Sequence, residues 1–256
     1  MSDATPSIAA FLDSVDAPER SLVTLNRTEP KPVQNLLELA FDGQTVTVGE
    51  SMLPEEAANL VLLVEDGEVV AVSPLEAVMD AFLLVNADLY RTGLSGLDKY
   101  EAPEVLTRLD ETVFRLRGYP ASNKEKLLLI VMSRYIERRA WVVGSGTLRS
   151  TFQRLSRIED ERGTRAVYER LSDTDVEVHV YGVPDWEPPA SLGVRLHTGT
   201  SADYRKSWCV VFVPEDDADA HAALVAVEVG RNEWRGMWTY RRDRVLAIQD
   251  YLVGHF

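Results

Sequence analysis

The sequence has a single cysteine, Cys209, among 256 residues. One thiol forms no disulfide within the chain and supplies too few ligands for a zinc site built on thiolates. Long apolar runs are also missing, since the longest, at 60–64 and 127–132, fall far below the roughly 20 residues of a membrane-spanning helix. The opening segment, MSDATPSIAAFL, lacks the basic and apolar regions of a signal peptide. We therefore expect a cytoplasmic protein with no membrane partner.

Lysine is the other scarce residue, with 5 lysines against 22 arginines, whereas Asp and Glu together number 41. The resulting net charge is -14. Such a surface remains soluble in concentrated salt, because salt screens the repulsion between like charges. We therefore predict a halophilic host, with an ordinary acidic cytosolic protein as the alternative. The same charge argues against nucleic acid as a partner, because binding phosphate requires a positive surface.

The first 86 residues have the pattern of one α/β unit. Alternating or apolar segments predict strands at 21–25, 45–48, 59–64 and 68–72, and apolar residues at helical spacing predict helices at 32–40 and 74–85. Glu65, Asp66 and Gly67 join the last two strands and are typical of a hairpin. The segment 87–102 carries two glycines and no sustained period, so we interpret it as an interdomain linker.

Residues 103–256 form the second predicted domain. Helical spacing of apolar residues predicts helices at 103–116 and 123–141, and helical structure again over 147–172 after the glycines 144 and 146. Strands are predicted at 176–181, 208–213, 223–229 and 237–240, before a C-terminal helix at 243–252.

The two halves share an order of elements. A helix, strands with a hairpin and a closing helix occur at 32–85 and again at 164–252. Sequential hairpins with flanking helices favour a mixed or antiparallel sheet over a doubly wound parallel one. The predicted fold class is α/β of the α+β type, with two related units, each a small mixed or antiparallel sheet flanked by helices. Generic α/β order is the alternative to a true duplication.

No catalytic or metal signature stands out. His179 alternates with valines on a predicted strand, and the remaining histidines are single residues without ligand spacing. Cys209 lies among apolar residues, where a buried small hydrophobe is the usual interpretation. A structural role is therefore the favoured interpretation for these side chains, and no cofactor is indicated.

Arginines and indoles beside glycines are the strongest candidates for recognition. The six arginines at 134, 138, 139, 149, 154 and 157 either line a pocket for an anion or form solvated ion pairs with nearby carboxylates, and ion pairs are the commoner outcome. Gly144, Ser145 and Gly146 precede a predicted helix, where free backbone amides can bind an anion. They lack the lysine of a phosphate loop, so a simple helix break is the favoured interpretation. Trp234 and Trp238 flank a glycine and either close a pocket or pack in the core.

Several segments, in order, resemble one known family. They are SRYIERRAW, GSGTLRSTFQRLSRI, VYERL, VHVYGVPD, WCVVFV, AALVAVE and WRGMWTY. Together they span roughly residues 110–253 and resemble the DICT sensory domain, with the N-terminal half similar to the leading segment of stand-alone haloarchaeal members. The resemblance implies a non-enzymatic signal-input module, coupled in some proteins to two-component or cyclic-dinucleotide output domains. None of those output domains is recognisable here, and the family supplies no catalytic residues.

We accordingly predict a sensory module that binds an unknown ligand or partner and passes the signal by protein–protein interaction. The expected partner is a histidine kinase, a response regulator or a transcription regulator. The candidate ligand-binding residues are Arg134, Trp141, Phe152, Gln153, Arg157, Trp234 and Trp238. One alternative is a homodimer or larger scaffold that pairs through the helices at 103–116 and 123–141. A second is a hydrolase or transferase built on His179 or His197.

Overall fold

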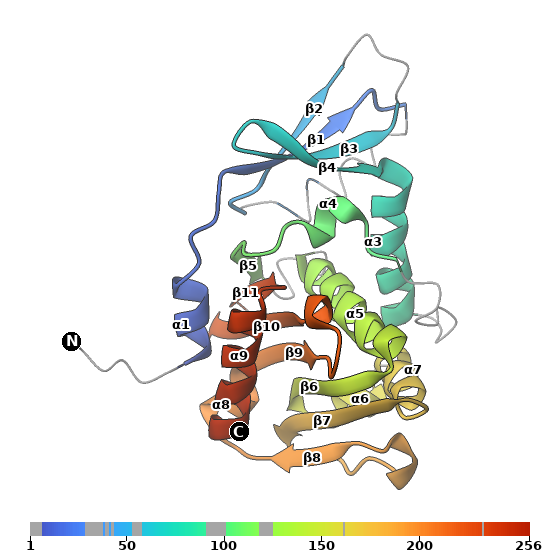
Figure 1. Cartoon of the computed structure of the whole chain (residues 1–256), viewed down its shortest axis with the longest axis vertical. Coiled ribbons are helices and arrows are strands. Elements are labelled where there is room, and N and C mark those ends of the chain that lie inside the picture. Colours follow the sequence, from blue (N-terminus) through green and yellow to red (C-terminus); the bar gives the residue numbers. More distant parts are fainter. Residues whose placement is uncertain are drawn as a thin grey trace, which may run out of the picture.

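The computed structural model describes residues 7–28, 38, 41, 44–52, 58–90, 101–117, 125–160, 162–231 and 233–256. Two sheets organise these residues, one of four strands and one of seven (Figure 1). Helices flank both sheets, so the predicted α/β class with two mixed sheets is confirmed. Most of the predicted helix at 32–40 and of the predicted linker at 87–102 lies outside the described residues.

The smaller sheet has the strand order β2-β1-β3-β4. It contains β1 (Arg20–Leu25), β2 (Thr47–Ser51), β3 (Leu60–Glu65) and β4 (Glu68–Pro74). β1 runs parallel to β2 and antiparallel to β3, and β3 and β4 form the predicted hairpin. Asp66 and Gly67 make its turn with φ values of 50° and 86°, the left-handed backbone that a tight hairpin requires.

Two helices close one face of this sheet. Residues Leu22, Val61 and Leu63 of the strands are fully buried together with Leu75 and Val78 of α3 (Leu75–Tyr90). The single-turn helix α4 (Glu104–Thr107) is anchored to β4, because the Ser73 hydroxyl accepts a hydrogen bond from the Val105 amide at 3.2 Å. This packing fixes the start of the second half of the chain against the first sheet.

The larger sheet has the order β5-β11-β10-β9-β6-β7-β8. Its strands are β5 (Phe114–Arg117), β6 (Ser145–Arg154), β7 (Asp175–Val183), β8 (Arg195–Thr198), β9 (Ser207–Val213), β10 (Ala222–Gly230) and β11 (Glu233–Thr239). β6, β7 and β8 are mutually parallel, and the remaining neighbours are antiparallel. The expected strands at 176–181, 208–213 and 223–229 are thus confirmed.

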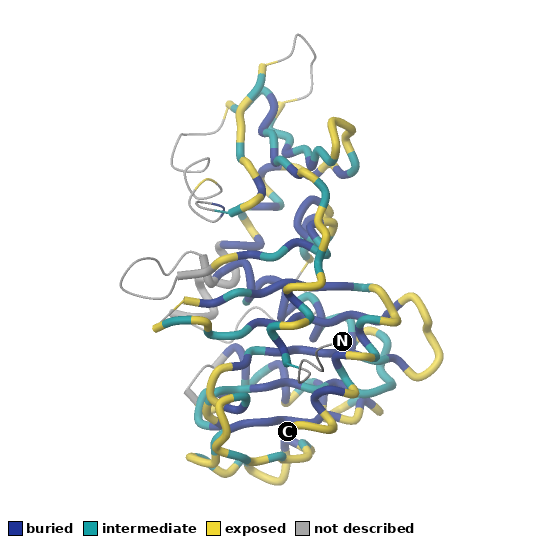
Figure 2. The backbone as a smooth tube through the Cα atoms, turned by 90° about the vertical axis from the view of Figure 1, so that its left-hand side faces the viewer, coloured by how far each residue is buried: buried dark blue, intermediate teal, exposed yellow. Residues whose placement is uncertain are grey.

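Helices cover the larger sheet on both faces (Figure 1). One face carries α5 (Glu125–Val143), α6 (Arg157–Asp160) and α7 (Arg162–Leu171), and the other carries α1 (Ile8–Asp13) and α9 (Arg242–His255). The short elements α8 (Ala202–Lys206), η2 (Ala190–Leu192) and η3 (Ala218–Ala220) complete the chain. Dark blue, buried stretches run through this part of the molecule (Figure 2), and β9 and β10 are buried along most of their length. The first helix of the chain therefore packs with the last, on the second sheet.

The two sheets share one connectivity. In the smaller sheet, β1 pairs in parallel with the next strand, β2, and on its other edge pairs with the antiparallel hairpin of β3 and β4. In the larger sheet, β6 pairs in parallel with the next strand, β7, and on its other edge pairs with the antiparallel strands β9 and β10. The order β2-β1-β3-β4 therefore recurs as β7-β6-β9-β10. This is the repeat of elements expected from the sequence, and it extends the match to β1 and β6.

The predicted helix over 147–172 is wrong in its first third. β6 occupies 145–154, and only α6 and α7 are helical. Gly146 enters the strand with φ at +112°, and a side chain there would lie 2.4 Å from the Val213 carbonyl oxygen. Pairing on both edges, with β7 and β9, outweighs the local helical spacing.

The predicted helix at 103–116 is also wrong. Only α4 forms there, and Glu111 then turns the chain with φ at 56° and donates its amide to the Trp238 carbonyl at 2.8 Å. β5 follows and pairs with β11. The helix pair on which the homodimer was placed therefore does not exist, and α5 is packed between the larger sheet and α3.

Candidate functional site

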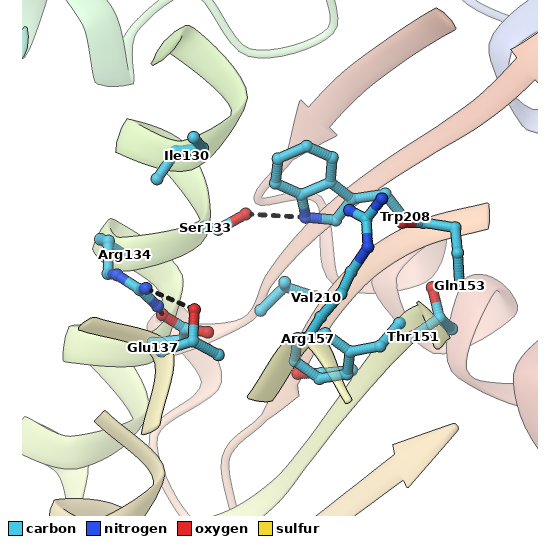
Figure 3. Close-up of a pocket in the computed structure, with 12 residues that line it drawn as sticks. Ile130, Ser133, Arg134, Glu137, Thr151, Gln153, Arg157, Trp208 and Val210 are labelled. Carbon is cyan, nitrogen blue, oxygen red and sulfur yellow. Dashed lines mark hydrogen bonds and ion pairs between the residues drawn. The ribbon is translucent and has the colours of Figure 1, made fainter. Parts of the chain in front are cut away.

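A pocket opens between α5 and the end of β6 in the larger sheet (Figure 3). Its volume is about 520 Å³, counted out to the solvent at its mouth. The lining residues are Ile130, Ser133, Arg134, Glu137, Ser150, Thr151, Phe152, Gln153, Arg157, Thr164, Trp208 and Val210.

One face of α5 supplies a wall of the pocket. Ile130, Ser133, Arg134 and Glu137 recur at the i, i+3, i+4 and i+7 spacing that aligns side chains along a helix. Neighbouring positions on the same helix, such as Met132 and Ile136, are buried and apolar. The sequence thus sets three polar residues beside buried apolar positions of the same helix.

A buried ion pair forms the deep end of this wall. Arg134 Nη1 lies 2.5 Å from Glu137 Oε2, and Arg134 Nη2 donates to Thr164 Oγ1 at 2.8 Å. The two charged residues are only 8% and 2% exposed. Because charges in such a place are costly unless paired, each holds the other in its ionised form. The pair leaves this end of the pocket electrically neutral.

Trp208 forms the opposite side, and its indole is fixed from two directions. Its Nε1 donates to Ser133 Oγ on α5 at 3.2 Å, a contact drawn in Figure 3. Trp234 stands edge-on behind it, with ring centroids 6.5 Å apart and planes at 87°. Edge-to-face pairs of this kind favour one orientation of each ring. The pocket therefore has a preorganised aromatic side.

Gln153 brings an unused acceptor to the pocket. Its Nε2 donates to the Ser207 carbonyl at 2.6 Å, whereas its buried Oε1 has no hydrogen-bond partner in the described part of the chain. The reverse amide orientation would set two oxygens against each other, so the donor must face Ser207. A buried acceptor left unpaired costs about 1–3 kcal/mol, which a ligand donor would offset.

Arg157 begins α6 and extends across the pocket toward Trp208 and Gln153 (Figure 3). It is half-buried, and among the described residues it has no hydrogen bond or ion pair. Nearby Arg154 differs, since it is largely exposed and lies 4.0 Å from Asp185. Arg157 is thus a cation without a protein counter-ion at the pocket.

The floor of the pocket combines aromatic rings with hydroxyl groups. Phe152 packs edge-on against Tyr168, with centroids 5.8 Å apart. Burial, reinforced by the nearby Glu137 carboxylate, raises the pKa of Tyr168 well above its usual value, so the phenol stays neutral. The buried Ser150 hydroxyl lies beside the Tyr168 hydroxyl. This side of the pocket can therefore accept or donate hydrogen bonds without adding charge.

Four of the seven candidate ligand residues meet in this pocket, namely Arg134, Phe152, Gln153 and Arg157. The other three lie elsewhere. Trp141 packs partly buried at the end of α5, and Trp234 stands behind Trp208. Trp238 is fully buried, stacks on Phe114 at 4.8 Å and donates its indole N–H to the Thr107 carbonyl, so it is part of the core.

Several pocket residues escaped the sequence analysis. Ser133 and Glu137 carried a detectable signal, because polar residues at helical spacing interrupt the buried stripe of α5. Thr151 and Trp208 carried none, since they meet across β6 and β9 only after the sheet has formed. Thr151 Oγ1 accepts the Cys209 amide at 2.8 Å and ties these strands together at the pocket.

The other face of the larger sheet carries a histidine pair. His179 Nδ1 and His197 Nε2 lie 2.8 Å apart, and His179 Nε2 lies 3.2 Å from Glu177 Oε2. Burial is the main cause that lowers the pKa of both imidazoles. Tyr181 stacks on His197 at 4.3 Å, and its hydroxyl accepts a hydrogen bond from Arg149.

This histidine pair has an acid–base partner, but in the described residues neither ring bonds a Ser, Thr or Cys nucleophile. The hydrolase hypothesis required such a group. Over the same described ranges, no three His, Cys, Asp or Glu side chains are arranged to hold a metal ion. No described helix combines the length and apolar character that a membrane span needs.

The pocket lies between a helix and the sheet of an α/β domain. A family model described as "Sensory domain in DIguanylate Cyclases and Two-component system" (DICT) matches residues 103–228. Those residues hold all twelve that line the pocket. This part of the chain therefore belongs to the DICT sensory domain family, as the resemblance of its segments suggested.

The remaining comparisons add little. No curated protein matches the chain. Among solved structures, the crystal structure of polyphosphate kinase from Porphyromonas gingivalis aligns with 95% of this chain at 10% identity and a TM-score of 0.35. The chain spans 46% of that enzyme's length. A likeness this low carries no argument about activity.

Proposed function

We propose that this chain senses a small molecule in the pocket between α5 and the larger sheet and passes the signal on by protein–protein interaction. The family assignment supports a signal-sensing module in general. The observation that carries the specific proposal is the unused Gln153 acceptor beside the unpaired Arg157 in one preorganised pocket. Groups of this kind are usually satisfied within a folded chain, so a ligand is the simplest partner for them.

Binding without catalysis fits the pocket chemistry better than a reaction does. Glu137 supplies the one carboxylate among the residues that line the pocket, and it already forms a buried ion pair with Arg134. Arg157 is a poor general acid or base, because a guanidinium remains protonated at all relevant pH values. We therefore place this chain among non-enzymatic modules, with a histidine kinase, a response regulator or a transcription regulator as the partner class.

The contacts of α5 suggest how ligand binding in the pocket would change the structure elsewhere in the molecule. α5 forms one wall of the pocket and also contacts α3, the helix that covers the smaller sheet. A ligand that shifts α5 would therefore alter the junction of the two sheets. The acidic, lysine-poor composition supports a salt-rich cytoplasm as the place where this occurs.

Native mass spectrometry of the protein purified from its own cells tests the proposal. We expect a retained small molecule in the unmodified protein and its loss in Ile130→Trp, which fills the pocket from α5. Val142→Trp is the matched control, because Val142 lies on the same helix, is 60% exposed and does not line the pocket. A protein that retains nothing, or variants that retain equal amounts, would contradict the proposal.

A further inference from the structure

The charges that line the pocket do not cancel. Two arginines and one glutamate are present among the twelve lining residues, which leaves one positive charge. Arg134 and Glu137 form the neutral pair, so the excess charge resides on Arg157. This occurs on a chain with a net charge of -14, where an unpaired arginine facing a pocket is not explained by the general composition. A guanidinium is planar and can donate two parallel N–H hydrogen bonds to the two oxygens of a carboxylate.

The second requirement comes from Gln153. One N–H of its amide donates to the Ser207 carbonyl, and its Oε1 acceptor has no partner among the described residues. That acceptor needs an N–H or O–H group. It lies on β6, four residues before Arg157, and Figure 3 shows both side chains directed toward the Trp208 side of the pocket. An occupant must therefore satisfy an acceptor and a cation on the same side.

The third requirement is a flat apolar body. Trp208 cannot swing freely, because Ser133 holds its indole nitrogen and Trp234 blocks it from behind. Ile130, Phe152 and Val210 supply further apolar surface. An indole fixed in this way favours a planar group that lies against it, because stacked or edge-on aromatic contacts gain more than the buried area alone.

We infer that the pocket takes a small planar organic acid that carries an N–H donor, with its carboxylate at Arg157, its N–H at Gln153 Oε1 and its ring beside Trp208. This inference rests on the proposed function, because it assumes that the pocket is the ligand site. It narrows the signal to one chemical class. Arg157 is the specificity determinant for the charge, and Gln153 is the determinant for the donor.

Three matched probes separate these requirements. Indole-3-acetate has the ring, the carboxylate and the N–H; indole-3-acetamide lacks the charge; and 1-methylindole-3-acetate lacks the donor. Binding is measured by calorimetry or ligand-observed NMR at one fixed salt concentration. We expect indole-3-acetate to bind roughly tenfold more tightly than the amide, which is the usual worth of one hydrogen bond to a charged group. The methylated acid should bind several-fold more weakly than indole-3-acetate, because Oε1 stays unpaired.

Two variants assign the charge effect to a residue. Arg157→Gln should weaken indole-3-acetate about tenfold and leave the amide unchanged. Arg157→Lys should restore part of the preference for the acid, since it keeps the charge without the two parallel N–H donors. Arg154→Gln is the control, because Arg154 is three residues away, 72% exposed and outside the pocket lining. It should leave all three affinities unchanged, and circular dichroism confirms that each variant is folded.

The outcomes distinguish this inference from the proposed function. If the amide binds as tightly as the acid, and Ile130→Trp abolishes both, the pocket is a ligand site but the acid class is wrong. If the acid preference persists in Arg157→Gln, or no probe binds, the inference is overturned. If Ile130→Trp leaves probe binding intact, the pocket itself is the wrong site and both conclusions fall.

Discussion

Removing the arginine of the buried ion pair should destabilise this protein more than any surface charge change. Arg134→Met would leave Glu137, which is 2% exposed, without its counter-ion at 2.5 Å, and would also remove the donor to Thr164. Breaking one side of a buried pair costs about 3–5 kcal/mol, because the remaining charge loses its counter-ion in a poorly hydrated place. For a chain of this size, about 1 kcal/mol corresponds to roughly 2–4 °C in melting temperature. We therefore expect a fall of about 6–20 °C.

A double-mutant cycle tests the physical reason. Arg134→Met with Glu137→Leu removes both charges, so it should recover much of the stability lost in the single variant. Arg165→Met is the matched control, because Arg165 pairs with Glu159 and Glu169 on the exposed side of α7. Such exposed pairs contribute little to stability, even though this residue makes two of them.

Differential scanning calorimetry and urea unfolding supply the stabilities. If Arg134→Met costs no more than Arg165→Met, the pair is not effectively buried in solution. If the double variant is as unstable as the single one, the loss comes from packing rather than from an uncompensated charge. Either result would refute the electrostatic account of this wall of the pocket.

Three further predictions concern the rest of the fold. Gly146→Ala should lower the free energy of unfolding by about 1–3 kcal/mol or more, because of its positive φ and the carbonyl at 2.4 Å, whereas Gly254→Ala, with open space around it, should be near neutral by the same urea titration. Burial raises the pKa of the Cys209 thiol to about 12, so a thiol-specific colour reagent should react only after unfolding, and rapid reaction in the native state would contradict this. Burial holds the pKa of His179 and His197 below the unfolded value of about 6.5. Stability should therefore be full above that pH and fall as pH drops through the folded values, with a slope of at most about 1.4 kcal/mol per pH unit for each imidazole. Thermal unfolding between pH 7.5 and 5 should show a smaller loss of stability in His197→Phe than in the unmodified protein. The charges of Glu177, Arg149 and Arg195, which face the histidines, remain in this variant. If the loss of stability with falling pH is unchanged, the histidine pair does not cause it.

The elements that could be predicted from sequence are those whose local signal agrees with their environment. The hairpin of β3 and β4 was predictable, because Asp66 and Gly67 adopt the left-handed backbone that their residue types tolerate. β9 was predictable because a continuous apolar run indicates a strand buried on both faces. β6 was not, because its sequence GTLRSTFQR mixes polar and apolar residues at spacings that also suit a helix. Its pairing partners lie about 30 residues away in β7 and 60 to 66 residues away in β9, so the local sequence gives no sign of them.

The candidate site shows the same division. Arg134, Phe152, Gln153 and Arg157 were predicted as ligand-binding candidates from the concentration of arginine and aromatic side chains near glycine breaks, and they line one pocket. The placement of Trp238 was not predictable. Its spacing from Trp234 is the same in a pocket and in a core, and only the stack on Phe114 shows which applies. An isolated sequence specifies which side chains are capable of binding, not which of them face one another.

By itself, the sequence determined the composition of the surface, the absence of thiolate chemistry, the alternation that makes most strands, and the family of its second half. These properties depend on residue type and short spacing alone. The tertiary structure decided that β6 is a central strand, that α1 packs beside α9, and that Gln153, Arg157 and Trp208 share one pocket. Each of these depends on contacts between distant segments, whose free energy appears only when the sheet closes and local preferences are overruled.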